Sequence, residues 1–140
     1  MMKKLIIILL LWFAFFSMVI ADAVIDEFRI DPGMNKVILS WKVTVEINVK
    51  GYKIQRGFSH NQLGDLDFVA ATPVVLQPGM SKNYTYTDKS IFKHAGRTFY
   101  YRINVIDQQD KVVATSPVHQ VSPQISAVRH TWGSIKAMFR

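Results

Sequence analysis

The feature that most constrains the fold is an alternation of side chains over residues 36–43, KVILSWKV. Every second residue from Val37 to Val43 is apolar, with Trp41 the largest, whereas Ser40 and Lys42 between them are polar. Because successive side chains of a strand point to opposite faces, this period of two predicts a strand with one buried face. We expect the other strands of the chain to cover Trp41 or to extend the sheet that contains it.

The rest of the chain up to Val121 predicts further short strands and no sustained helical period. Turn residues such as Pro32 and Gly33 separate them. Pro117 has no N–H group, so the last strand must lie at an edge or break there. The seven predicted strands are residues 24–30, 36–45, 51–56, 67–71, 83–88, 98–106 and 112–121, with loops expected at 46–50 and 57–65. This spacing predicts an all-β fold, an antiparallel sandwich or a small barrel.

Four segments resemble the fibronectin type III domain in order and spacing: VILSW at 37–41, GYKIQR at 51–56, YTDKSI at 86–91 and TFYYRINVID at 98–107. The resemblance covers about residues 24–121 and implies a seven-stranded antiparallel, immunoglobulin-like sandwich with Trp41 between its sheets. The family usually has a tyrosine where Phe99 stands, and Phe99 cannot donate the hydrogen bond with which that hydroxyl closes a corner. The expected core is Val37, Leu39, Trp41, Tyr52, Ile54, Tyr86, Ile91, Phe99, Tyr101, Ile103 and Val105.

The chain opens with Lys3 and Lys4 before an apolar stretch at residues 5–20, which we call the leader block. Two cations, an apolar stretch and the small residues Ala21 and Ala23 are typical of a secretory signal peptide. We therefore expect residues 1–23 to be removed after Ala23, or alternatively after Ala21, to give a secreted or periplasmic product. A retained block would instead anchor the chain in a membrane, although it is just short of the roughly 20 residues that a spanning helix prefers.

Composition narrows the possible functions. The chain has no cysteine, so disulfides and thiolate metal sites are excluded, which suits a secreted protein of a bacterial envelope. The formal net charge is +7 at pH 7, and a basic chain favours acidic partners. Over residues 24–120, however, the cations are scattered, which indicates an ordinary solvated surface and no nucleic-acid partner.

The sequence contains no catalytic or metal-binding pattern. The histidines are widely spaced and lack metal-ligand spacing. Ser59 beside His60 lacks the flanking glycines of a nucleophilic serine. Asp65 and Asp67 alone supply too few oxygen donors for a calcium loop. We expect a non-enzymatic protein with no cofactor, for which a small-molecule ligand is not indicated.

Residues 122–140 form a separate basic tail (the tail) with the pattern of a short amphipathic helix. Ser122 followed by Pro123 is a typical helix start. Five apolar side chains fall within an arc of about 80° on a helical wheel, and cations lie along one flank. The apolar residues are Ile125, Val128, Trp132, Ile135 and Phe139, and the cations are Arg129, Lys136 and Arg140.

This stripe has three interpretations: it packs on the sandwich, it docks into a groove of a partner protein, or it lies on an anionic membrane surface. We expect an exported binding module of the cell envelope or extracellular space, with a protein as its partner and the tail as docking element. The alternatives are peripheral membrane attachment through the tail and a carbohydrate-binding accessory role. For the latter, outward-facing Tyr100 near Arg102 is the candidate stacking residue.

Overall fold

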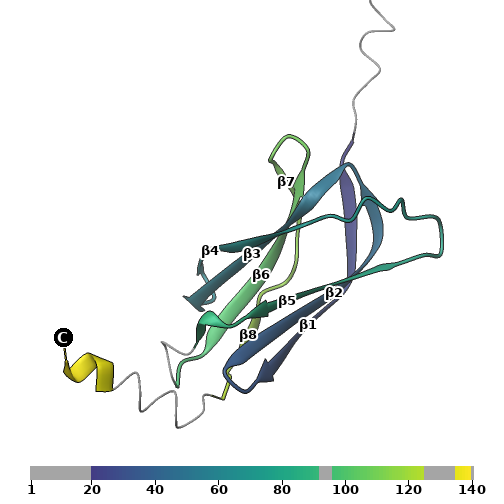
Figure 1. Cartoon of the computed structure of the whole chain (residues 1–140). Coiled ribbons are helices and arrows are strands. Elements are labelled where there is room, and N and C mark those ends of the chain that lie inside the picture. Colours follow the sequence, from purple (N-terminus) through teal and green to yellow (C-terminus); the bar gives the residue numbers. More distant parts are fainter. Residues whose placement is uncertain (1–19, 92–95, 125–134, 140) are drawn as a thin grey trace, which may run out of the picture.

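The structure is a computed structural model that describes residues 20–91, 96–124 and 135–139. These residues form eight strands, with helical residues at 90–91 and 135–138 (Figure 1). The strands are β1 (Asp22–Gly33), β2 (Lys36–Ile47), β3 (Val49–Ser59), β4 (Gln62–Ala70), β5 (Lys82–Asp88), β6 (Phe99–Asp107), β7 (Val112–Thr115) and β8 (His119–Val121).

The strands make two antiparallel sheets, which confirms the predicted all-β class. One sheet has the order β1-β2-β5, and the other has the order β4-β3-β6-β7, with β8 also pairing with β6. The last predicted strand breaks at Pro117, one of the two outcomes that its missing N–H allows, so the described residues form eight strands instead of seven.

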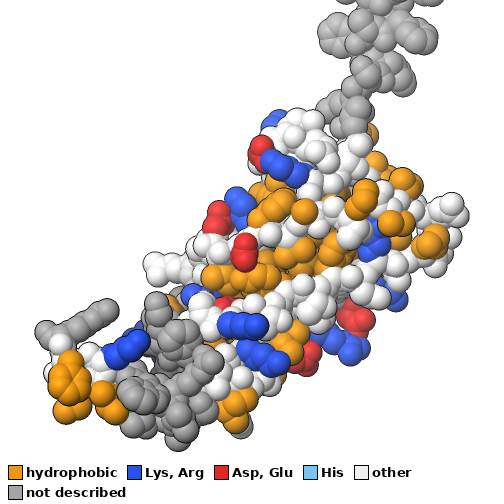
Figure 2. Space-filling model, in the orientation of Figure 1, with side chains coloured by type: hydrophobic (Ala, Val, Ile, Leu, Met, Phe, Trp, Pro, Cys, Tyr) orange, Lys and Arg blue, Asp and Glu red, His pale blue; other side chains and the backbone are white. Residues whose placement is uncertain are grey.

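The core lies between the sheets around Trp41, whose side chain is 2% exposed. Its indole meets the Tyr52 ring edge-on at 5.4 Å between centroids and stacks on the Tyr84 ring at 5.5 Å. All expected core residues are buried except Tyr86, which is half-buried because β5 is an edge strand. Where the sandwich opens, hydrophobic side chains show between polar ones (Figure 2). Further core members are Ala23, Val43, Val49, Tyr84 and Val121.

Two expected loops are wrong. β2 and β3 are separated by Asn48 alone, which turns the chain with a positive φ of 52°. The expected loop at 57–65 is a hairpin in which β3 runs to Ser59 and β4 begins at Gln62. β4 is an edge strand with no fully buried residue, so its sequence lacks the alternation that predicts a strand.

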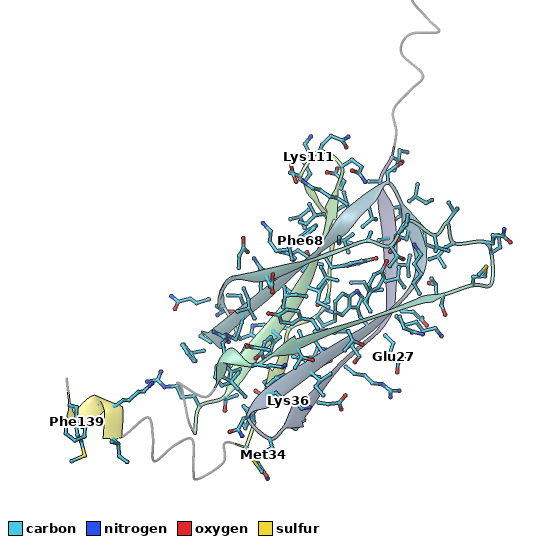
Figure 3. The ribbon with its side chains drawn as sticks, viewed as in Figure 1. Glu27, Met34, Lys36, Phe68, Lys111 and Phe139 are labelled. Carbon is cyan, nitrogen blue, oxygen red and sulfur yellow. The ribbon has the colours of Figure 1, made fainter. Side chains whose placement is uncertain are left out.

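The strand registers place the connections at two opposite ends of the sandwich. Asp22 pairs with Ile47, and Val49 pairs with Asp107. The start of β1, the β2–β3 turn, the crossing at residues 71–81 and the β6–β7 turn therefore share one end, which we call the leading end. Figure 3 shows Lys111 at this end of the molecule.

The β1–β2 and β3–β4 turns and the end of β8 lie at the opposite, trailing end. Gln124 forms a parallel bridge with Met34 there, and Asn35 donates a backbone hydrogen bond to the Gln124 carbonyl at 2.9 Å. Figure 3 shows Met34 and Lys36 at this end, with Phe139 beyond them. The chain thus enters the sandwich at one end and leaves it at the other.

β1 begins at Asp22, inside the segment expected to be a signal peptide. Ala23 is buried and pairs with Glu46 of β2. Removal after Ala23 would take a core residue from β1, whereas removal after Ala21 would leave the strand whole.

Candidate functional site

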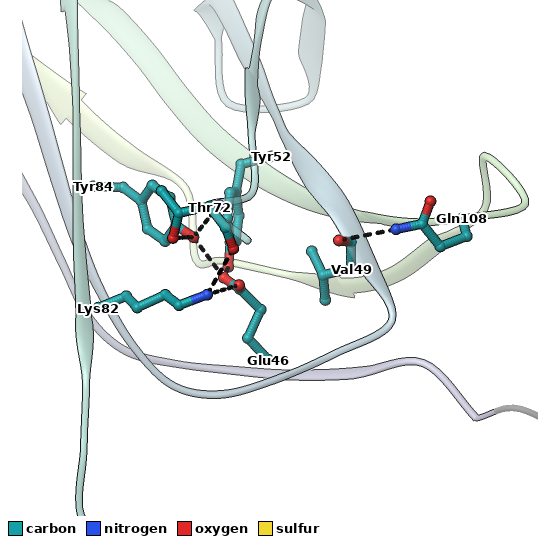
Figure 4. Close-up of polar contacts among 7 residues, drawn as sticks. All are labelled: Glu46, Val49, Tyr52, Thr72, Lys82, Tyr84 and Gln108. Atoms are coloured by element: carbon teal, nitrogen blue, oxygen red, sulfur yellow. Dashed lines mark hydrogen bonds and ion pairs between the residues drawn. The ribbon is translucent and has the colours of Figure 1, made fainter. Parts of the chain in front are cut away.

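Glu46 is the centre of a buried polar cluster at the leading end, which we call the Glu46 cluster (Figure 4). Its Oε2 accepts hydrogen bonds from the hydroxyls of Tyr52 at 2.5 Å and Tyr84 at 2.8 Å, and its Oε1 pairs with Lys82 Nζ at 2.5 Å. Lys82 also donates to the Thr72 carbonyl at 2.9 Å, and the Thr72 N–H donates to the Tyr84 hydroxyl at 3.1 Å. Burial, and next the hydrogen bond to Glu46, raise the pKa of Tyr52 far above its ordinary value.

Asp88 is the centre of a second cluster at the trailing end, which we call the Asp88 cluster. Its Oδ2 accepts from Arg56 Nη1 at 2.5 Å and from the Tyr101 hydroxyl at 2.9 Å. Its Oδ1 accepts from the backbone N–H and the hydroxyl of Ser90 at 2.8 and 2.7 Å. Burial opposes the charged form, but the hydrogen bonds from Ser90, Arg56 and Tyr101 outweigh it and lower the pKa of Asp88.

Both clusters are suited to holding strands together. In each, a buried carboxylate is neutralised by one cation and hydrogen-bonded to tyrosine. A general acid or base must instead reach a substrate and have a pKa near the working pH. Neither cluster was predicted, because its members come from distant parts of the sequence. The one available signal was Asp88, which stands in phase with Tyr84 and Tyr86 on the inward face of β5.

Tyr100, the candidate for sugar stacking, is half-buried on the outer face of the larger sheet. The His60 ring lies edge-on to it at 6.4 Å between centroids. Arg102 is bound elsewhere, since its Nε and Nη2 donate to Gln55 Oε1 at 3.0 and 2.6 Å. The structure therefore places a histidine ring edge-on beside Tyr100, and not a ring that extends the same stacking plane.

The two aspartates considered for calcium are engaged with protein groups. Asp65 accepts from Gln55 Nε2 at 2.8 Å and pairs with Lys53 at 3.0 Å, and these two partners lower its pKa. Asp67 accepts from the N–H of Phe68 at 2.8 Å. Within residues 20–91, 96–124 and 135–139, no three His, Cys, Asp or Glu side chains are grouped so that they could hold a metal ion.

The outer face of the β1-β2-β5 sheet has a polar depression of about 290 Å³. Its charged side chains are already paired: Arg29 with Glu27, and Lys42 with Asp26 at 3.9 Å. The lining is Glu27, Arg29, Ser40, Trp41, Lys42, Asn83, Tyr84 and Thr85.

The described part of the tail exposes its apolar side chains. Met138 and Phe139 are 82% and 88% exposed, and Ile135 and Lys136 are also exposed. Met138 is not one of the five apolar residues of the predicted stripe, so the exposed apolar surface is larger here than expected. Predicted tail residues that lie outside the described residues are Ile125, Val128, Arg129, Trp132 and Arg140.

No helix in the described ranges is both long and apolar enough to cross a bilayer. No protein-family model matches the chain, and no curated protein matches it. Among solved structures, the chain is similar to a beta-1,2-glucanase from Parabacteroides distasonis, with a TM-score of 0.56 and 14% sequence identity. The match covers 78% of this chain but 14% of the glucanase. At this identity the similarity concerns the fold alone.

Proposed function

We propose that this chain is an exported, non-enzymatic interaction module in which a fibronectin type III-like sandwich carries a tail that docks onto a partner protein. The observation that carries the proposal is the exposure of Met138 and Phe139 beyond a sandwich whose core is already filled. Large apolar side chains gain free energy when they are removed from water, and a helix with such a face fits a groove on another protein.

The arrangement around Trp41 supports the fibronectin type III-like part of this proposal. Trp41 of the second strand lies between two antiparallel sheets and contacts Tyr52 of the third strand, as the resemblance implies. The hydroxyl that Phe99 lacks is supplied two residues later. Tyr101 donates to Asp88, so β6 is tied to the end of β5 at the corner.

The two buried clusters support a role without catalysis. Their carboxylates are bound to groups that belong to the fold, so a substrate would have to displace the bonds that hold the sheets together. The exported location rests on Lys3, Lys4 and the leader block, which together have the pattern of a secretory signal.

A pull-down from the native host tests the docking role. We compare the full chain with a chain that lacks residues 125–140, which keeps the bridge between Gln124 and Met34. Met138→Ser combined with Phe139→Ser should lose the same partner as the truncation. Met34→Ser is the matched control, because Met34 is an exposed methionine on the sandwich. Equal partner sets for all four proteins would refute a docking tail.

Sedimentation with lipid vesicles separates a protein partner from a membrane surface. If the tail binds anionic lipid, more of the full chain than of the chain that lacks residues 125–140 will sediment with anionic vesicles at low salt. High salt will remove this difference, because screening weakens such attraction. Recovery of one protein that is insensitive to lipid favours the proposal.

A further inference from the structure

Large apolar side chains are concentrated at the leading end of the sandwich. They come from the start of β1, the β2–β3 turn, the crossing at residues 71–81 and the start of β7. Figure 2 shows hydrophobic side chains on the side of the molecule where the chain enters. We call this set the leading rim, and its exposed members are Ile20, Ile47, Val74, Val75, Met80 and Val112.

The trailing end is less apolar. On the described part of the sandwich, its large exposed apolar side chains are Met34 and Phe58, to which the tail adds its own. Phe58 is covered in part by Arg97, whose guanidinium carbon lies 5.1 Å from the ring centroid. Single exposed apolar residues are ordinary on a protein surface, whereas several at one end mark a contact surface.

The leading end also carries charged side chains: Asp22 and Lys111 are exposed there, whereas two cations are held in ion pairs. Lys50 pairs with Asp110 at 2.5 Å, and Lys82 pairs with Glu46. The apolar contribution to the attraction of this end for a partner should depend little on salt, unlike the attraction of the basic tail.

The leader block joins the sandwich at this end and indicates what the leading rim contacts. Ile20 is the last residue of the leader block, and β1 begins at Asp22, so the two positions are at most about 7 Å apart. The Ile20 carbonyl also accepts a hydrogen bond from Asn48 Nδ2 at 3.3 Å. Because no linker separates the block from the sandwich, a membrane that holds the leader block would touch the leading rim.

We infer that the leading rim rests on a lipid bilayer and that the leader block is retained as its anchor. The block, of which the structure describes Ile20 alone, is just short of the roughly 20 residues that a spanning helix prefers. The rim adds apolar surface where the block ends, at the depth of about 5–10 Å that interfacial segments reach. This inference assumes the export proposed above and places the tail at the far end, where it meets a partner away from the membrane.

The chain has no cysteine, so single probes can be introduced cleanly. We would label Val75→Cys and, as a matched control, Met34→Cys with an environment-sensitive fluorophore in the full chain, reconstituted in zwitterionic vesicles. Val75 and Met34 are 81% and 58% exposed, so neither change disturbs the core. The Val75 probe should shift to shorter wavelength and be quenched several-fold more by nitroxide-labelled lipid than the Met34 probe. Added salt should leave this difference unchanged.

Three results would overturn the inference. Equal quenching of both probes by aqueous iodide would place the rim in water. Shielding of the Val75 probe from iodide without quenching by lipid would indicate a protein contact or a second copy. An intact mass that lacks the leader block in protein isolated from the native host would remove the anchor. Export itself is tested separately by the protease accessibility of the sandwich in cells, so its failure is distinguishable from that of the rim.

Discussion

The two ends of the sandwich are closed by the same chemistry but surrounded by different surfaces. At the leading end Glu46 is held by Lys82 and by two tyrosine hydroxyls, and at the trailing end Asp88 is held by Arg56 and Tyr101. Around the first cluster several large apolar side chains are exposed among polar ones. Around the second the exposed side chains are more polar, and the tail leaves from there.

This difference separates what stabilises the fold from what the surface is used for. A buried carboxylate bound to a cation and a tyrosine joins strands from both sheets, and it does so at either end. The exposed side chains at the two ends are not needed to fill the core, so we relate the difference between them to the contacts proposed above for each end. The following changes test whether the buried clusters at the two ends are equivalent while the exposed surfaces around them differ.

Removing either buried charge should have the largest effect. Asp88→Asn leaves Arg56 unpaired and Glu46→Gln leaves Lys82 unpaired, and each should lower the free energy of unfolding by about 3–5 kcal/mol. Urea denaturation measures the loss. Asp65→Asn is the control, because its pair with Lys53 is exposed and should be worth less than about 1 kcal/mol. If only one of the two buried substitutions cost as little stability as Asp65→Asn, the two clusters would not stabilise the fold equally.

The next largest effect should be a loss of stability at low pH, caused by protonation of Asp88 at the trailing end. The pKa of Asp88 in the folded protein lies below its ordinary value of 3.8, so the unfolded chain binds the proton at a higher pH than the folded chain. The contribution of Asp88 to stability is thus complete above about pH 4 and is lost as the pH falls further. The thermal midpoint of the natural protein should fall more steeply below pH 4 than that of Asp88→Asn. Parallel curves would contradict this assignment.

Substituting the two glycines of β3 that lie close to the backbone of β4 should lower the stability by a smaller amount. A Cβ at Gly57 would lie 1.9 Å from the Gln62 carbonyl oxygen, and one at Gly51 would lie 2.5 Å from that of Val69. Alanine at either position should cost about 1–3 kcal/mol through overpacking. Gly64→Ala is the matched control, since nothing lies within 4 Å of the new methyl group. Denaturation midpoints that do not separate Gly64→Ala from the other two would show that the hairpin adjusts freely.

The smallest effect on stability is expected at the leading rim. Val74→Ser with Val75→Ser should change the free energy of unfolding by no more than about 0.5 kcal/mol, because both side chains are exposed. Co-sedimentation of the full chain with zwitterionic vesicles should nevertheless fall, whereas Met34→Ser should not change it. A large loss of stability in the double variant would mean that the rim packs on its own sandwich.

The sequence predicted the parts of the molecule that have a local pattern. The alternation around Trp41 placed β2 in the core. The missing N–H of Pro117 predicted an edge position or a break in the last strand, and the structure has the break between β7 and β8. β4 was mostly missed, because an edge strand with no fully buried residue has no alternation. Tyr86 was assigned to the core by its phase, yet the open edge of β5 leaves it half-buried.

The candidate sites were harder to predict, because they are made by contacts between distant residues. Glu46 was expected in a loop, and nothing near it in sequence indicates that Lys82 and Tyr84 meet it. Val74 and Val75 lie between the strands predicted at residues 67–71 and 83–88, where the sequence has no local pattern. The register of the strands is what brings that crossing beside Ile20 and Ile47.

The positions at which the chain enters and leaves also have a mechanical consequence. Asp22 and Gln124 lie at opposite ends, so tension between an anchored start and an engaged tail runs along the strands. Hydrogen bonds of an antiparallel pair lie across the strand direction, so such a load shears the whole β1–β2 ladder at once. A sandwich stretched in this way resists as a unit and does not open one bond at a time, which suits a spacer that transmits force from a surface to a distant contact.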